Sequence, residues 1–89
     1  MQVETLIEAI EQEQVVETKD IILYNDDVNT FDYVVDLLMK YCDHQPIQAE
    51  QCTWIVHHNG KCQVKRGEVA ELKPICQALC DAGLSAVIE

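Results

Sequence analysis

Short apolar blocks separated by polar turns run along most of the chain, and their spacing predicts the order of the elements. The β-rich run at residues 21–24 predicts a strand that ends at Asn25. Residues 31–42 repeat apolar side chains with helical spacing, so we expect a helix there. Asn29 or Thr30 is expected to cap its start, because either side chain can accept a hydrogen bond from a free backbone N–H.

The middle of the chain predicts a second helix, from Pro46 to about His58. Proline suits the first position of a helix, where its missing N–H is not needed. Residues 61–65 alternate between polar and apolar side chains, as a half-buried strand does. Arg66-Gly67 is expected to turn the chain after this strand.

A third helix and a last strand complete the predicted elements. Apolar spacing places this helix at Glu68 to Ala82, and Pro74 inside it is expected either to kink it or to divide it. Gly83 is a natural stop, and residues 84–88 predict the final strand. The order β-α-α-β-α-β predicts an α+β fold, a two-layer sandwich in which three helices cover one face of three short strands.

Length and charge limit the number of domains and the classes of partner. The chain has 89 residues, enough for one domain, which we place at residues 20–89 after a flexible acidic N-terminal arm at residues 1–19. Acidic residues outnumber basic ones by 16 to 6, for a formal charge of −10. This charge disfavours nucleic acid and anionic membranes as partners, because both are negative. No apolar run approaches the roughly 20 residues of a membrane span.

The five cysteines are an odd number and no secretory signal precedes them, so we expect reduced thiols in a cytoplasmic protein. Cys76 and Cys80 lie one helical turn apart on the apolar face, which favours packing over metal binding. Cys52 and His57 are a conceivable nucleophilic pair, but no orienting acid or oxyanion-binding element is visible. We therefore predict no catalytic residue, metal or cofactor.

Two polar clusters are candidates for a binding site. Asn25-Asp26-Asp27 is typical of a strand exit with side-chain-stabilised turns, but it also offers several acceptors to a primary ammonium, which has three donors. A hard metal ion needs more oxygen ligands than this stretch supplies. His57 and His58 point in different directions on a helix, so only one can share a site with the turn, and a surface or capping role is the alternative.

Three blocks, in order along the chain, resemble the ClpS adaptor family. The first is the apolar strand, the Asn-Asp-Asp turn and the amphipathic helix of residues 23–38. The second, at residues 48–61, contains Val-His-His-Asn-Gly and is similar to the family's Val-His-x-x-Gly motif. The third, at residues 67–73, resembles the start of the family's last helix. The resemblance covers about residues 21–89.

The resemblance implies a non-enzymatic adaptor for N-degrons, which are substrates with a free α-amino group and a bulky hydrophobic first residue. It implies delivery of these substrates to an Hsp100 Clp unfoldase, of the ClpA or ClpC type, for degradation by ClpP. The α-amino group is expected to contact Asn25, Asp27 and His57, with Asp26 adding negative potential. The family pattern, carried over residue by residue, places in the side-chain pocket Asn29, Thr30, Phe31, Val34, Thr53, Val56 and Leu84.

The resemblance also implies an unfoldase interface that includes Glu68 and Lys73, an arm that engages the unfoldase, and a monomer. Phe31 and Thr53 stand where the family usually has Met. Phe31 is expected to crowd the pocket mouth and to disfavour Ile and Val as first residues. Two other classes remain open: an acidic interaction domain with the architecture of the ribosomal stalk domain and no amine recognition, or a thiol or metal protein.

Overall fold

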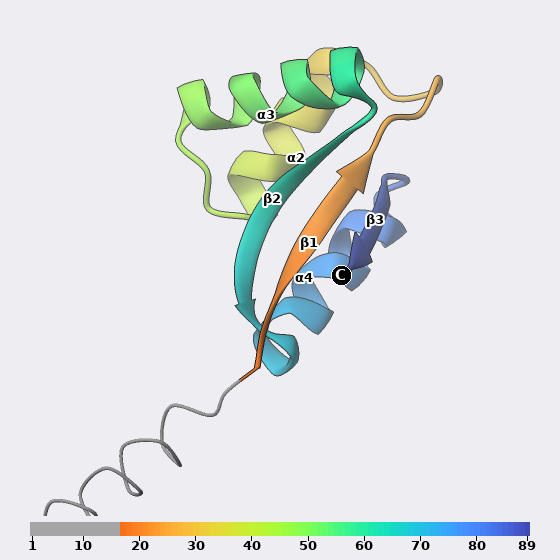
Figure 1. Ribbon diagram of the computed structural model, residues 1–89. Coiled ribbons are helices and arrows are strands. Elements are labelled where there is room, and N and C mark those ends of the chain that lie inside the picture. The colour runs from red at the N-terminus through yellow and green to blue at the C-terminus, as the bar shows by residue number, and fades with distance from the viewer. Residues whose placement is uncertain (1–16) are drawn as a thin grey trace, which may run out of the picture.

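The computed structural model describes residues 17–89, which form three helices and a three-stranded antiparallel sheet (Figure 1). The elements follow the order β-α-α-β-α-β, which confirms the predicted α+β fold. Their bounds are β1 Thr18–Tyr24, α2 Phe31–Tyr41, α3 Pro46–Asn59, β2 Lys61–Glu68, α4 Val69–Asp81 and β3 Ser85–Ile88. Most of the predicted arm lies outside the described residues, and its last two residues, Thr18 and Lys19, belong to β1.

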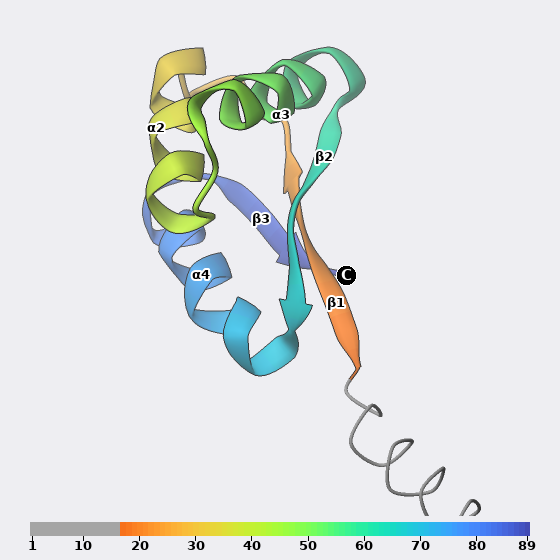
Figure 2. The same ribbon diagram turned by 90° about the vertical axis from the view of Figure 1, so that its left-hand side faces the viewer.

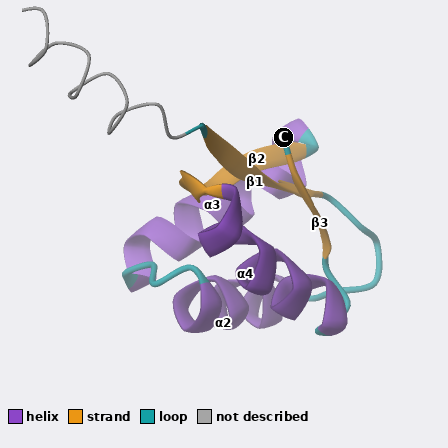
Figure 3. Cartoon of the chain, turned by 90° about the horizontal axis from the view of Figure 1, so that it is seen from below, coloured by secondary structure: helices purple, strands orange, loops and turns teal. Residues whose placement is uncertain are grey.

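The sheet has the order β2-β1-β3, so β1 is the central strand. Seen from the side and from below, the three helices lie on one side of the strands, which gives two layers (Figures 2 and 3). Ile21 and Leu23 of β1 and Leu38 of α2 are almost fully buried between the layers, as are Leu72 and Leu79 of α4. This packing holds the end of β1, where the acidic turn begins, on a rigid support.

Two strands are longer than their apolar residues predict. β1 begins at Thr18 and β2 continues to Glu68, so the prediction that Arg66-Gly67 turns the chain is wrong. The added residues form pairs across the sheet, among them Thr18 with Glu68. Backbone hydrogen bonding extends both strands here, although their side chains are mostly polar and contribute little to the core.

The helix ends agree with the capping predictions, and the last helix is continuous at its internal proline. Thr30 caps α2, since its Oγ1 accepts a hydrogen bond from the backbone N–H of Tyr33 at 3.2 Å. Pro46 begins α3, and Gly60 ends it with a φ of 92°, in the left-handed region that glycine adopts without strain. α4 continues through Pro74 and is not divided. None of the helices within residues 17–89 is long and apolar enough to cross a membrane.

Candidate functional site: a pocket beside the acidic turn

The turn after β1 is held by the carboxylate of Asp26. Its Oδ1 accepts hydrogen bonds from the backbone N–H groups of Val28 and Asn29, each at 2.9 Å. Its Oδ2 accepts a hydrogen bond from Nδ2 of Asn29, also at 2.9 Å. The same Nδ2 donates to the carbonyl of Gly83 at 2.9 Å, which ties the turn to the connection between α4 and β3.

The turn is also tied to the end of α3. The backbone N–H of Asn25 donates to the carbonyl of Gly60 at 2.8 Å. Gly60 follows the last turn of α3, which carries Val56 and His57. Segments that are far apart in the sequence therefore meet at one end of the sheet, and His57 lies beside Asn25 and Asp26.

A small pocket opens where these segments meet, and its free volume of about 10 Å³ is roughly what one water molecule needs. Polar side chains of the turn and of α3 form part of its wall, and buried apolar side chains from four elements or connections form the rest. Its lining residues are Leu23, Tyr24, Asn25, Asp26, Asn29, Val34, Thr53, Val56, His57 and Leu84. A site of this composition can bind a group that is polar at one end and apolar at the other.

The surroundings of the Asp26 side chain favour its charged, carboxylate form. Partial burial works against ionisation, but the hydrogen bonds from Asn29 and Val28 outweigh it. Together they hold the pKa of Asp26 below its ordinary value of 3.8. The pocket therefore carries a fixed negative charge at neutral pH, although Asp26 is also engaged in the turn.

The structure gathers most of the residues that the family pattern placed at the site. Of the predicted amine contacts, Asn25 and His57 line the pocket. Asp26 lines it as well, while Asp27 is exposed and does not. Of the predicted side-chain pocket, those that line it are Asn29, Val34, Thr53, Val56 and Leu84.

Thr30 and Phe31, which the family pattern also places at the site, are not among the residues that line the pocket. Thr30 uses its hydroxyl to cap α2 and does not line the pocket. Phe31 also lies outside the lining, and its ring stacks on the ring of His57, with centroids 5.7 Å apart. Leu23 and Tyr24 line the pocket although sequence reasoning did not select them. Both residues end the strand directly before Asn25, and this position next to the turn could have identified them as pocket residues.

The cysteines and histidines do not converge into a metal site. Across residues 17–89, no group of three or more His, Cys, Asp or Glu side chains is placed to hold a metal ion. All five thiols are free. The Sγ atoms of Cys76 and Cys80 both donate to the carbonyl of Ala86, at 3.5 Å and 3.2 Å, so they pack α4 against β3.

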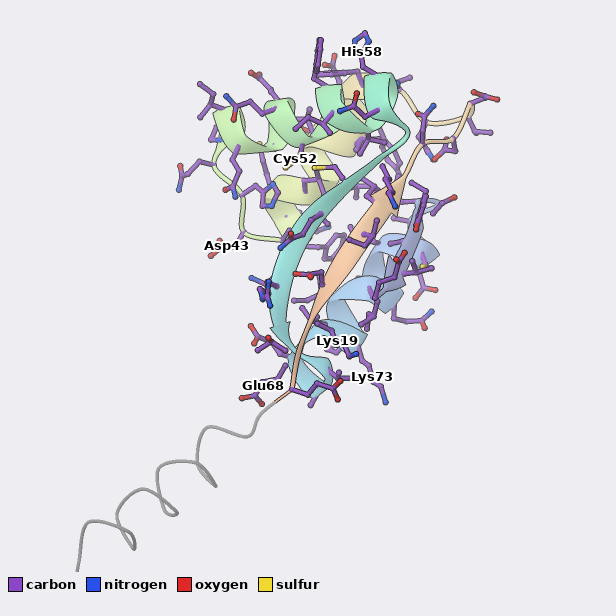
Figure 4. The ribbon with its side chains drawn as sticks, viewed as in Figure 1. Lys19, Asp43, Cys52, His58, Glu68 and Lys73 are labelled. Atoms are coloured by element: carbon purple, nitrogen blue, oxygen red, sulfur yellow. The ribbon has the colours of Figure 1, made fainter. Side chains whose placement is uncertain are left out.

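Glu68 and Lys73 lie at the opposite end of the sheet from the pocket. Figure 4 shows both near Lys19, at the end where β1 begins, whereas His58, next to the pocket residue His57, lies at the other end. Both Glu68 and Lys73 are exposed. The register pairs Thr18 with Glu68, so the chain before β1 emerges directly beside these residues.

The chain matches a family model over residues 14–86, and the family is described as the ATP-dependent Clp protease adaptor protein ClpS. It is 40% identical over 55 residues to the ATP-dependent Clp protease adapter proteins ClpS of Salmonella gallinarum and Escherichia coli O1:K1. Each of these matches covers 60% of this chain and 52% of the relative, so the chain spans about half the length of these curated relatives.

A solved structure has the same fold. Agrobacterium tumefaciens ClpS2 bound to L-phenylalaninamide superposes with a TM-score of 0.78 at 18% sequence identity. The superposition covers 82% of this chain and 95% of that one. The fold and the match to the family model agree, and the family description is that of an adaptor and not of an enzyme. The chain belongs to the ClpS family of Clp protease adaptors.

Proposed function

We propose that this protein is an N-degron adaptor. It binds substrates through a free α-amino group and a bulky hydrophobic first side chain, and it delivers them in the cytoplasm to an Hsp100 Clp unfoldase of the ClpA or ClpC type. The observation that carries the proposal is the pocket in which Asn25, Asp26 and His57 meet an apolar lining. An amino-terminal residue has the matching pair of features, a cationic ammonium and a side chain on the next atom.

The polar part of the pocket suits an ammonium. Asp26 supplies negative charge, the side-chain carbonyl of Asn25 is an acceptor, and a neutral His57 offers a ring nitrogen as a third acceptor. An ammonium has three N–H donors, so each can find one partner. Hydrogen bonds to charged groups are the strong ones, which makes the free amine the main determinant of binding.

The apolar lining of the pocket matches the first side chain in chemistry, and the lining has to move apart to admit a bulky one. Val34, Val56 and Leu84 are buried residues that line it. Thr53 is fully buried, and its hydroxyl already donates to the carbonyl of Ala49 at 2.7 Å, so it needs no partner from a ligand. The ClpS2 structure of similar fold was bound to L-phenylalaninamide, a free amine with an aromatic side chain, which supports this class of ligand.

The pocket and the expected unfoldase interface lie at opposite ends of the sheet, which supports the proposed delivery of substrates to the unfoldase. The pocket lies where β1 ends, and Glu68 and Lys73 lie where β1 begins (Figure 4). An unfoldase bound at the Glu68 end leaves the pocket open for substrate. The arm joins the domain at that same end, beside Glu68, so one partner can contact both.

The test compares two peptides that differ only in N-acetylation, each with Leu as first residue. The free peptide is expected to bind, and the acetylated peptide to lose all measurable binding, because an unpaired buried acceptor costs about 1–3 kcal/mol and several would be unpaired. His57→Ala should weaken binding of the free peptide about tenfold or more. For a peptide with Gly at positions two and three, His58→Ala is the matched control, since His58 does not line the pocket and should leave affinity unchanged.

Equal affinity for the two peptides would contradict amine recognition. It would favour the second class, an acidic interaction domain of the same architecture. Retained affinity in His57→Ala together with loss in His58→Ala would contradict the assignment of the two histidines.

A further inference from the structure

A second hollow lies beside the pocket on the surface of α2 and α3. It has a free volume of about 300 Å³, and it is lined by Phe31, Ile47, Glu50, Gln51 and Trp54. Two of its apolar side chains are largely exposed, with 68% of Ile47 and 55% of Trp54 accessible. Large apolar side chains gathered in one exposed groove are typical of a binding surface.

The groove and the pocket share a wall. Phe31 lines the groove, His57 lines the pocket, and their rings stack nearly parallel with centroids 5.7 Å apart. Trp54 is steadied on the same helix, because its ring lies 4.0 Å from the ring of His58. The groove therefore lies next to the pocket, with the stacked rings of Phe31 and His57 between them.

We propose that this groove binds an apolar side chain at the second or third residue of the substrate. The inference rests on the proposed function, since it takes the amine at His57 as the origin of the peptide. An extended peptide advances about 3.3 Å per residue. The ring of Phe31 lies 5.7 Å from the ring of His57, a distance that two residues of such a chain can span. A substrate that leaves the pocket over this ring pair thus brings its second and third side chains to the groove.

The chemistry of the groove selects among these side chains. Phe31, Ile47 and Trp54 offer apolar and aromatic contact. Glu50 is exposed on the same wall and repels an acidic side chain. Substrates with aromatic or aliphatic residues after the first are therefore favoured, and substrates with Asp or Glu there are disfavoured.

The experiment uses two peptide series with a free Leu as first residue, in which position two or position three is Gly, Phe or Asp. In the wild-type protein, Phe at one of these positions should bind about fivefold or more tightly than Gly. Trp54→Ala should remove most of this ratio. Val87→Ala is the matched control, because Val87 is an exposed apolar residue of β3 that lines neither cavity, and it should keep the ratio. Glu50→Gln should reduce the loss seen with Asp.

The outcomes separate this inference from the function on which it rests. If the wild type distinguishes free from acetylated peptides but binds the Gly and Phe peptides alike at both positions, the groove is not a substrate subsite, and the amine pocket stands. A Phe-to-Gly ratio that survives Trp54→Ala would also overturn the inference. Failure to distinguish the acetylated peptide would instead overturn the proposed function itself.

Discussion

The ring of Phe31, the first residue of α2, stacks on the ring of His57 in the last turn of α3, with 14° between their planes. This contact joins two helix ends beside the candidate site. Phe31 does not line the pocket, but it faces a residue that does. We therefore expect Phe31 to act on binding through the position of the His57 ring, and not through direct contact with the first side chain of a substrate.

Phe31→Ala is expected to lower affinity by a similar factor for all first residues. Ring stacking contributes about 0.5–1.5 kcal/mol, which corresponds to about a two- to tenfold loss when His57 is no longer held. The measurement is a titration with peptides that begin with Leu, Phe or Ile. If the variant instead gains affinity for Ile relative to Leu, Phe31 gates the pocket directly, as the family pattern implies.

The two aspartates of the turn are expected to differ in their contribution to binding. Asp26→Asn should weaken binding of a free Leu peptide about tenfold or more, because it removes the charge that lines the pocket. Asp27→Asn is the matched variant, with the same chemical change at the exposed neighbour, and it should change affinity little. Circular dichroism of both variants checks that the fold is kept. A larger effect at Asp27 would restore the assignment made from the sequence.

The ionisation of Asp26 predicts how the stability of the turn depends on pH. Because hydrogen bonds hold its pKa below 3.8 in the folded protein, the charged carboxylate contributes stability above that value. The contribution is lost as the pH falls through the lower, folded-state pKa. The difference in free energy of unfolding between wild type and Asp26→Asn should therefore be constant above about pH 5 and shrink towards pH 2. A difference that grows on acidification would contradict this assignment.

Sequence patterns predicted the elements well where apolar spacing or a cap determines them. Thr30 and Pro46 are local signals, and both helices begin where these residues indicate. The extension of β2 through Gly67 was missed, because it depends on pairing with residues at the start of β1 that read as part of the arm.

Contacts between distant segments also limit what the sequence predicts about the candidate site. Asp26 and Asp27 are adjacent acidic residues, and their local composition does not show which of them lines the pocket. Only the structure shows that the Asp26 side chain contacts Asn29 and lines the pocket. The position of Phe31 likewise depends on where the last turn of α3 comes to lie against α2, a contact between segments far apart in the chain.

Two of the thiols are expected to react slowly with alkylating agents. Burial raises the pKa of Cys42 to about 11, and burial together with the neighbouring Cys52 thiol raises that of Cys62 to about 12. At pH 8 only about one molecule in a thousand or fewer then carries the reactive thiolate at either position. Mass spectrometry after a short treatment with iodoacetamide should find both largely unmodified, whereas all five cysteines should react in denaturant. Rapid labelling of native Cys42 would contradict its burial.

Deletion of residues 1–16 is expected to separate binding from delivery. The cut lies before β1, which begins at Thr18, so the sheet and the pocket at its far end keep all their residues. Affinity for a free Leu peptide should therefore be unchanged. Degradation of a reporter with an N-terminal Leu, reconstituted with a ClpA- or ClpC-type unfoldase and ClpP, should fall to the level without adaptor, because the arm joins the domain beside Glu68 at the proposed unfoldase interface. A shortened protein that binds the peptide and still supports full degradation would show that the arm has no part in delivery.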